Sequence, residues 1–243
     1  MTTLVLVAGA LALVLICGGR PWENLPNGDT LRRLAGTLFT LGAGAAFGTV
    51  MVAMLSEQAV VTEFEAGRAT LVGAGAAFAV LIVARVLAVS ALDELALFAA
   101  VVGMVIGALV MTIEDSDDAA RILQWTLLTT GMAWALVGTY TALLRNRALA
   151  AALGLALALF GGAAVAENPW SHRIALLTLV AVTLGVYLTR PSWPYITAAI
   201  IAAVVLTVTW VGEALGPALA LLSAGVVVLV LAGGALYLHR HTA

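Results

Sequence analysis

The charged residue with the most unusual setting in this sequence is Arg85, because it lies inside a long apolar run. Between residues 69 and 113 only Arg85, Asp93 and Glu94 interrupt that run. A charge within a membrane-spanning segment is costly and often functional. One interpretation is that Arg85 contacts an anion or a lipid headgroup. The simpler interpretation is structural: its side chain reaches the nearby membrane surface, or it pairs with Asp93 or Glu94.

A second polar group is a run of acids in a predicted loop, whose oxygen atoms suit Ca²⁺ or Mg²⁺. The metal-ligand candidates are Glu114, Asp115, Asp117 and Asp118. The run lacks the spacing and the glycine of an EF-hand loop. Ser116 followed by two acids also fits a helix N-cap with acids in the first turn, and this explains the acids without a metal.

Three more polar residues lie at predicted external joints. Glu167 and His172 flank a short turn, and a carboxylate near a histidine can transfer protons. No third partner for such chemistry is evident in the loop. Glu213 follows the aromatic residue Trp210 and is interpreted as a solvated turn residue.

Several kinds of membrane chemistry lack their residues. Lysine is absent, which excludes a retinal Schiff base. His172 lies on the opposite predicted side from His239 and His241, so paired haem ligation within the membrane has no ligands. The single cysteine, Cys17, has no partner for an intramolecular disulfide. No acid or lysine lies at mid-span to relay protons. We therefore expect no cofactor, and no nucleic-acid partner.

The elements that carry these residues are predicted to be membrane-spanning helices. Of the 243 residues 63% are hydrophobic and 10% are charged, with a mean hydropathy of +1.11, whereas a soluble domain has about 25% charged residues. Apolar runs of about 20 residues are typical of transmembrane helices. The sequence predicts an all-α polytopic bundle forming one integral membrane domain over residues 1–243. The nine predicted spans are 3–18, 31–55, 63–91, 93–113, 119–144, 148–166, 172–189, 194–211 and 217–238.

Local signals mark several helix ends. Thr62 and Glu65 have the spacing of a capping box, and Ser90 and Asp93 repeat it. Pro194 and Pro217 fit first-turn positions. Three pairs of small residues four positions apart allow close helix packing, either inside one bundle or at a subunit interface. The pairs are Gly44 with Gly48, Gly103 with Gly107, and Gly154 with Ala158.

The arginines predict the orientation, because cytoplasmic loops carry an excess of them. One predicted side holds seven: Arg20, Arg32, Arg33, Arg145, Arg147, Arg190 and Arg240. The other side holds Arg68, Arg121 and Arg173. We expect the amino terminus outside and the carboxy terminus in the cytoplasm. Arginine supplies every basic residue, and the richness in Ala, Gly, Val and Leu favours a high-GC bacterial genome, hence a bacterial cytoplasmic membrane.

Three functions remain open. The leading hypothesis is a non-catalytic subunit or accessory scaffold of a membrane complex, packed against lipid and against a membrane-protein partner or a second copy. The alternative is a transporter or flippase for a weakly polar or lipidic substrate, using Arg85 and the small-residue helix faces; it predicts a threonine-lined cavity near the midplane. The third is a membrane-embedded enzyme with an external pocket that unites the acids with Glu167 and His172.

Overall fold

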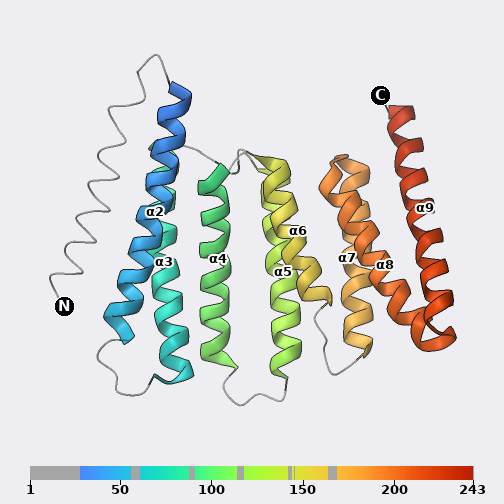
Figure 1. Ribbon diagram of the computed structural model, residues 1–243, viewed down its shortest axis with the longest axis horizontal. Helices are drawn as coiled ribbons and strands as arrows, with labels where there is room; N and C mark the ends of the chain where they lie inside the picture. The colour runs from blue at the N-terminus through green and yellow to red at the C-terminus, as the bar shows by residue number, and fades with distance from the viewer. Residues whose placement is uncertain are drawn as a thin grey trace. The chain divides into compact units, whose positions relative to one another are not determined.

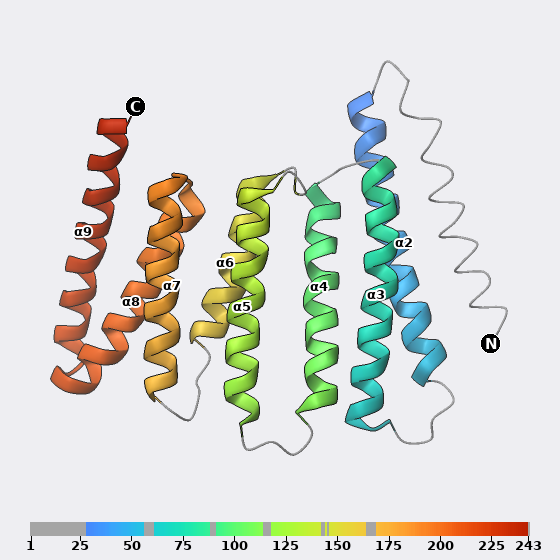
Figure 2. The ribbon, with the colours of Figure 1, turned by 180° about the vertical axis from the view of Figure 1, so that it is seen from behind.

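The computed structural model is all-helical over the residues that it describes, which are 28–55, 61–87, 91–113, 118–141, 144, 146–163 and 169–242. Figures 1 and 2 show the helices from two opposite sides, coloured along the chain. The eight described helices are α2 (Gly28–Leu55), α3 (Glu63–Leu87), α4 (Ala91–Thr112), α5 (Ala119–Tyr140), α6 (Arg147–Ala163), α7 (Pro169–Thr189), α8 (Trp193–Leu215) and α9 (Pro217–Thr242).

These eight helices coincide with the second to ninth predicted spans, with ends that differ by a few residues. Six of the described helices are long and apolar enough to cross a membrane, namely α2, α3, α4, α7, α8 and α9. Helix α6 is apolar but shorter, with 17 residues. The predicted first span, 3–18, lies outside the described residues. The all-helical, membrane-compatible class is therefore confirmed, while the count of nine spans and the orientation stay predictions.

The capping box at the start of α3 is formed as predicted. The backbone N–H of Thr62 donates to Glu65 Oε2 at 3.2 Å, and the N–H of Glu65 donates to Thr62 Oγ1 at 3.3 Å. Pro194 lies in the first turn of α8, and Pro217 begins α9. Ser90, the first residue of the second predicted box, lies outside the described residues.

The N-cap predicted around Ser116 is wrong in its register. Asp118 occupies the N-cap position of α5, and its side chain makes no capping hydrogen bond. Its carboxylate instead accepts a hydrogen bond from Arg121 Nη2 at 2.9 Å. Because α5 begins at Ala119, no acid lies in its first turn. The basic side chain one turn into the helix draws the carboxylate away from the backbone.

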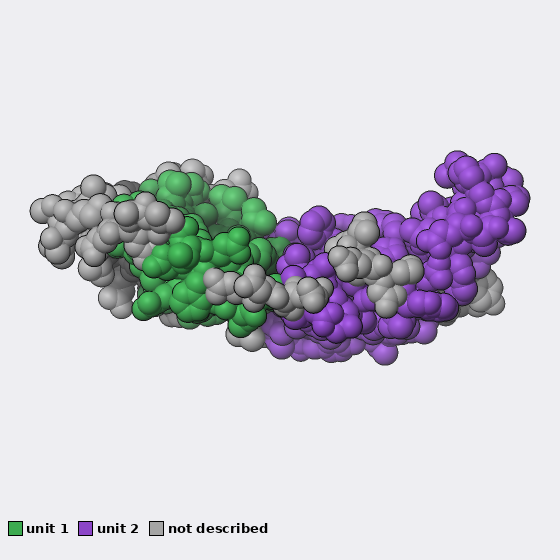
Figure 3. Space-filling view, turned by 90° about the horizontal axis from the view of Figure 1, so that it is seen from below, with its two compact units in different colours: residues 1–116, 144–146 green, residues 117–143, 147–243 purple. Residues whose placement is uncertain are grey.

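The contacts between residues divide the chain into two compact units (Figure 3). Unit 1 comprises residues 1–116 and 144–146 and contains α2, α3 and α4; unit 2 comprises residues 117–143 and 147–243 and contains α5 to α9. In unit 1, α3 packs against both α2 and α4. In unit 2, α6 packs against α5, α7 and α8, and α8 also packs against α7 and α9.

The core of unit 2 depends on backbone contact between α5 and α6. A Cβ atom added at Gly154 would lie 2.5 Å from the carbonyl oxygen of Gly131 and 2.6 Å from the nitrogen of Ala135. Ala158, the other member of the predicted small pair, is fully buried in the same core. These two residues thus pack inside unit 2, as the interpretation of one bundle expects. Larger side chains such as Leu155, Leu176 and Tyr195 fill the space around them.

Helices α8 and α9 are joined by one residue, Gly216. Its backbone angles are φ +87° and ψ 167°, a region that glycine alone adopts readily. The N–H of Gly216 closes α8 by donating to the carbonyl of Gly212 at 3.2 Å, and the N–H of Ala220 donates to Gly216 at 3.2 Å.

Candidate binding site in the first helical unit

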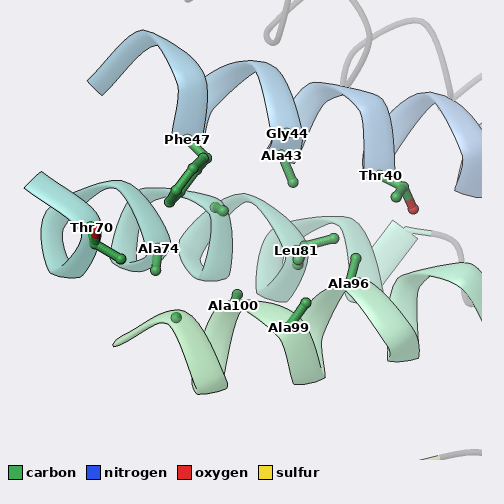
Figure 4. Close-up of a pocket in the computed structure, with 12 residues that line it drawn as sticks. Thr40, Ala43, Gly44, Phe47, Thr70, Ala74, Leu81, Ala96, Ala99 and Ala100 are labelled. Carbon is green, nitrogen blue, oxygen red and sulfur yellow. The ribbon is translucent and has the colours of Figure 1, made fainter. Parts of the chain in front are cut away.

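A cavity of about 340 Å³ lies between α2, α3 and α4 in unit 1 (Figure 4). Its wall is built almost wholly of alanine and glycine, with one larger side chain from each of α2 and α3, Phe47 and Leu81, and two threonines. The lining residues are Thr40, Ala43, Gly44, Phe47, Thr70, Ala74, Ala77, Leu81, Ala96, Ala99, Ala100 and Gly103.

The cavity follows from where the small residues lie on each helix. Gly103 and Gly107 of α4 lie against α3, because a Cβ added at Gly107 would come within 2.6 Å of the nitrogen of Leu71. On α2, by contrast, a Cβ added at Gly44 or Gly48 meets no atom within 4 Å. The predicted pair on α2 therefore makes no close backbone contact within the described chain, and Gly44 is exposed at the cavity instead.

The cavity extends along the helices from one end of the candidate spans to their middle. Thr40, Leu81 and Ala96 lie within four residues of the ends of their spans. At the other limit, Phe47, Thr70 and Gly103 are at least seven residues from both ends of theirs, so at about 1.5 Å per residue they lie about 10 Å or more along the helix.

Both threonine hydroxyls of the wall are hydrogen-bonded to other groups. Thr40 Oγ1 donates to Asp93 Oδ1 at 3.2 Å, and Thr70 Oγ1 donates to the carbonyl of Ala66, one turn earlier, at 2.8 Å. A threonine hydroxyl has a single proton to donate. The wall of the cavity consequently offers apolar surface rather than free hydroxyl donors.

An ionic cluster lies beyond the Thr40 end of the cavity. Arg85 Nη2 is 3.6 Å from Glu94 Oε1, and the backbone N–H of Asn146 donates to the same oxygen at 2.9 Å. The residues Asp93 and Glu94 are each only 2% exposed. The pairing of Arg85 with Glu94, one of the structural alternatives drawn from the sequence, is thus present. Whether Arg85, Asp93 and Glu94 also bind a substrate or lipid remains a prediction.

Helical geometry makes the cluster continuous with the cavity. Arg85 follows Leu81 by four residues on α3, and Asp93 precedes Ala96 by three residues on α4. Residues three or four apart lie on the same face of a helix. The apolar walls of α3 and α4 therefore end in charged side chains, close to where the span itself ends.

The predicted external sites are only partly described. Asp118 pairs with Arg121 at an exposed position, with 55% and 57% of the two side chains accessible. Glu114, Asp115, Asp117 and Glu167 lie outside the described residues. Among the residues that the structure describes, no group of three or more His, Cys, Asp or Glu side chains could hold a metal ion.

The prediction that Glu213 lies in a turn is wrong, whereas its predicted exposure is confirmed, with 59% of its side chain accessible. Helix α8 continues to Leu215, so Glu213 is helical, and its carboxylate forms an ion pair with Arg173 Nη2 of α7. The Arg173 guanidinium also lies 5.3 Å from the ring centre of Trp170 and 5.8 Å from that of Trp210. These contacts tie the start of α7 to the end of α8 through charge and cation–π attraction.

The predicted end of the eighth span missed this extension, because the sequence places Gly212 and Glu213 where a turn would suit.

The sequence marks Gln124 as a polar group inside an apolar span of unit 2 but does not identify its partner. Gln124 is fully buried, and its Oε1 accepts a hydrogen bond from Ser171 Oγ at 2.9 Å. The Nε2 of Gln124 and the Nδ1 of His172 are buried without a hydrogen-bond partner. The signal that points to this contact is an amide inside an apolar span, because such a group needs a partner from another helix.

No protein-family model matches this sequence, and it shows no match to a curated protein or to a solved structure. The apolar helices are compatible with an integral membrane protein. The cavity and the adjoining ionic cluster of unit 1 are the features on which a more specific function is argued.

Proposed function

We propose that this chain is an integral membrane transporter or flippase for a weakly polar or lipidic substrate, and that α2, α3 and α4 hold the substrate. The observation that supports this function is the cavity between those helices, which leads from one end of the candidate spans to their middle. Its volume, about 340 Å³, lies near the lower end of the range of about 300–1,000 Å³ for ligand pockets.

The cavity supports this proposal because it reaches the middle of the candidate spans, where the transporter hypothesis expects it. An apolar groove open to lipid also fits a structural subunit, and the translocation assay below distinguishes the two functions. The wall of alanine and glycine agrees with the small-residue helix faces of the transporter hypothesis. The predicted threonine lining is not found, because of the lining residues only Thr40 and Thr70 carry hydroxyls.

The ionic cluster supplies an anchored end for the cavity. The contacts among Arg85, Glu94 and Asn146 join α3, α4 and the segment at residue 146, and Thr40 joins α2 to α4 through Asp93. Farther along α2, a Cβ added at Gly44 or Gly48 meets no atom within 4 Å, although Phe47 between them packs closely against Gly73 of α3. We propose that α2 yields at this face when a substrate enters.

The test is a translocation assay with the full chain in liposomes. A phospholipid with a fluorescent headgroup is placed in both leaflets, and a membrane-impermeant reductant bleaches the outer one. Liposomes that contain the protein should lose fluorescence beyond the outer-leaflet fraction. Gly44→Leu should bring this rate close to that of protein-free liposomes, because the new side chain occupies the cavity.

Gly48→Leu is the matched control. It adds the same side chain to the same helix, also at a position with no atom within 4 Å of the new Cβ, but outside the cavity lining. It should translocate at the unchanged rate. Equal rates for both variants and the original protein, or no translocation by any of them, would overturn the proposal.

The subunit hypothesis is kept as a second candidate because of α9. Its residues Leu221, Leu222, Leu229 and Val230 are 66–74% exposed, and α9 packs mainly on α8. Lipid or a protein partner, including a second copy, would cover such a surface. Native mass spectrometry of protein extracted in mild detergent would identify a stoichiometric partner, and its presence would favour this candidate.

We further propose a bacterial cytoplasmic membrane as its location, in the orientation drawn from the arginine distribution. In that orientation the ionic cluster lies at the cytoplasmic end of unit 1. Labelling of single cysteines in loops, with Cys17 replaced, by an impermeant reagent on intact cells tests the orientation.

A further inference from the structure

We infer that the cavity of unit 1 takes one acyl chain of a bilayer phospholipid, and that the phosphate of the same lipid lies beside Arg85. The inference rests on the proposed function and names its substrate class. It combines two observations: the wall of the cavity is apolar, and Arg85 is the most accessible charged side chain of the cluster at the end of the cavity.

The wall fits a hydrocarbon chain and disfavours a polar ligand. Apart from Thr40 and Thr70, every lining residue is apolar or glycine, and the hydroxyls of those two threonines already donate elsewhere. A polar group placed there would give up its hydrogen bonds to water without replacement. An acyl chain has no hydrogen bonds to water to lose, since it moves from one apolar environment to another.

The entrance faces a region where such chains are present. Gly44 is exposed and lines the cavity, and it lies seven residues inside its candidate span. A membrane protein presents that depth to lipid tails, because the hydrocarbon core is about 30 Å thick. A chain can thus enter sideways past Gly44, whose missing side chain leaves the passage open.

The charge at the end of the cavity fits a phosphate. Within the ionic cluster the side chain of Arg85 is 16% exposed, while that of Glu94 is 2% exposed and Asp93 is equally buried as a whole residue. A headgroup approaching the cluster therefore meets the Arg85 side chain before it meets a carboxylate, although the Nη1 atom of Arg85 is itself buried. A guanidinium attracts phosphate oxygens through its charge and its N–H groups.

The depth of Arg85 agrees with this assignment. The candidate span of α3 ends at Val83, two residues before Arg85. Lipid phosphates lie just outside the hydrocarbon core. The inferred lipid would therefore have its phosphate beside Arg85 and its chain beside Leu81, one turn earlier on α3. A free phosphate ion would use Arg85 alone and leave the cavity unused, and for this reason we commit to a phospholipid.

The experiment is photo-crosslinking of the full chain in lipid nanodiscs. The probe is a phospholipid with a diazirine in the middle of one acyl chain, and adducts are located by mass spectrometry of peptides. We expect adducts on peptides of α2 and α4 around the cavity. Gly44→Leu should reduce their yield about tenfold, which corresponds to about 1.4 kcal/mol of lost binding. Gly48→Leu should leave the yield unchanged, and equal yields in the two variants would overturn the acyl-chain assignment.

The headgroup is tested with a diacylglycerol that carries the same diazirine chain but no phosphate. The original protein should prefer the phospholipid probe. The double variant Arg85→Gln with Glu94→Gln removes both charges of the pair, so that neither partner is left as an unpaired charge by the other's removal. It should keep chain labelling but lose the preference for phosphate. Equal labelling of the original protein by both probes would overturn the phosphate assignment.

Failure of the lipid-binding inference can be distinguished from failure of the proposed transport function. Cavity labelling that is sensitive to Gly44→Leu, without lipid translocation in liposomes, would support the inference and overturn transport. Translocation without labelling at the cavity would support transport and overturn the inference.

Discussion

In unit 2 the backbones of α5 and α6 touch at Gly131 and Gly154, whereas in unit 1 Gly44 of α2 faces an open cavity. The two units are similar in sequence, because both contain apolar helices with small residues four positions apart. In unit 2 the small residues of one helix meet those of another, and the gap closes. In unit 1 the same happens between α3 and α4 at Gly67 and Gly107, but on the side of α2 the alanines and glycines of three helices surround a common space.

The polar contacts of the two units differ in the same sense. Unit 1 buries charges, with Arg85, Asp93 and Glu94 grouped at one end. Unit 2 uses hydroxyl groups inside its core: Tyr195 is fully buried, its hydroxyl lies 2.6 Å from that of Thr139 and donates to the carbonyl of Ala135 at 2.9 Å. Neutral hydrogen bonds suit a core that only has to hold its shape. Buried carboxylates cost more to remove from water than hydroxyl groups, so the end of unit 1 that holds Asp93 and Glu94 depends on their charged and hydrogen-bonding partners.

The largest effect is expected from removing Arg85, the cation of the ionic cluster in unit 1. Arg85→Ala leaves Glu94 buried beside an empty position, and breaking a buried ion pair in this way costs about 3–5 kcal/mol. Thermal unfolding in a mild detergent should show a clear loss of stability. Adding Glu94→Gln to the same chain should restore most of it, since no unpaired carboxylate remains. If Arg85→Ala alone is as stable as the original protein, the Arg85–Glu94 pair contributes no stability. The energetic difference argued between the two units would then be wrong.

The next effect concerns the close contact in unit 2. Gly154→Ala adds one methyl group, which would lie 2.5 Å from a carbonyl oxygen and 2.6 Å from a backbone nitrogen on α5. Neither atom can move without shifting the helix, and overpacking of this kind costs about 1–3 kcal/mol. The midpoint of thermal unfolding should fall. An unchanged midpoint would mean that α5 and α6 are not in backbone contact.

The smallest effect is expected from the same substitution in unit 1. Gly44→Ala meets no atom within 4 Å, and alanine favours a helix over glycine by up to about 1 kcal/mol. Unfolding should occur at the same or a slightly higher temperature. Gly44→Ala and Gly154→Ala are chemically identical changes. The difference between their unfolding temperatures therefore measures the difference in packing between the two units. A destabilisation as large as that of Gly154→Ala would contradict the open cavity.

Much of the fold follows from the sequence, because helix positions depend on local signals. The apolar runs predict every described helix to within a few residues, and the Thr62–Glu65 capping box is formed as its spacing indicates. The cap near Asp118 failed because a competing partner, Arg121, lies one turn away and takes the carboxylate.

The candidate site was only partly predictable. Arg85 was recognisable as a charge in an apolar run, and its pairing with Glu94 was one of the expected alternatives. The sequence could not tell which small-residue pair closes a contact and which lines a cavity. That distinction depends on how each helix is rotated and tilted against its neighbours, which tertiary packing decides. The alanines that line the cavity carry no individual signal for the same reason.

The one-residue joint between α8 and α9 has a consequence for how the protein is made. Helices in bundles are usually joined by about 2–8 residues, but here Leu215 ends one helix and Pro217 begins the next. A joint of one residue leaves no loop between the two helices, which pack against each other as one hairpin. We expect α8 and α9 to enter a membrane together, with Gly216 at the turn.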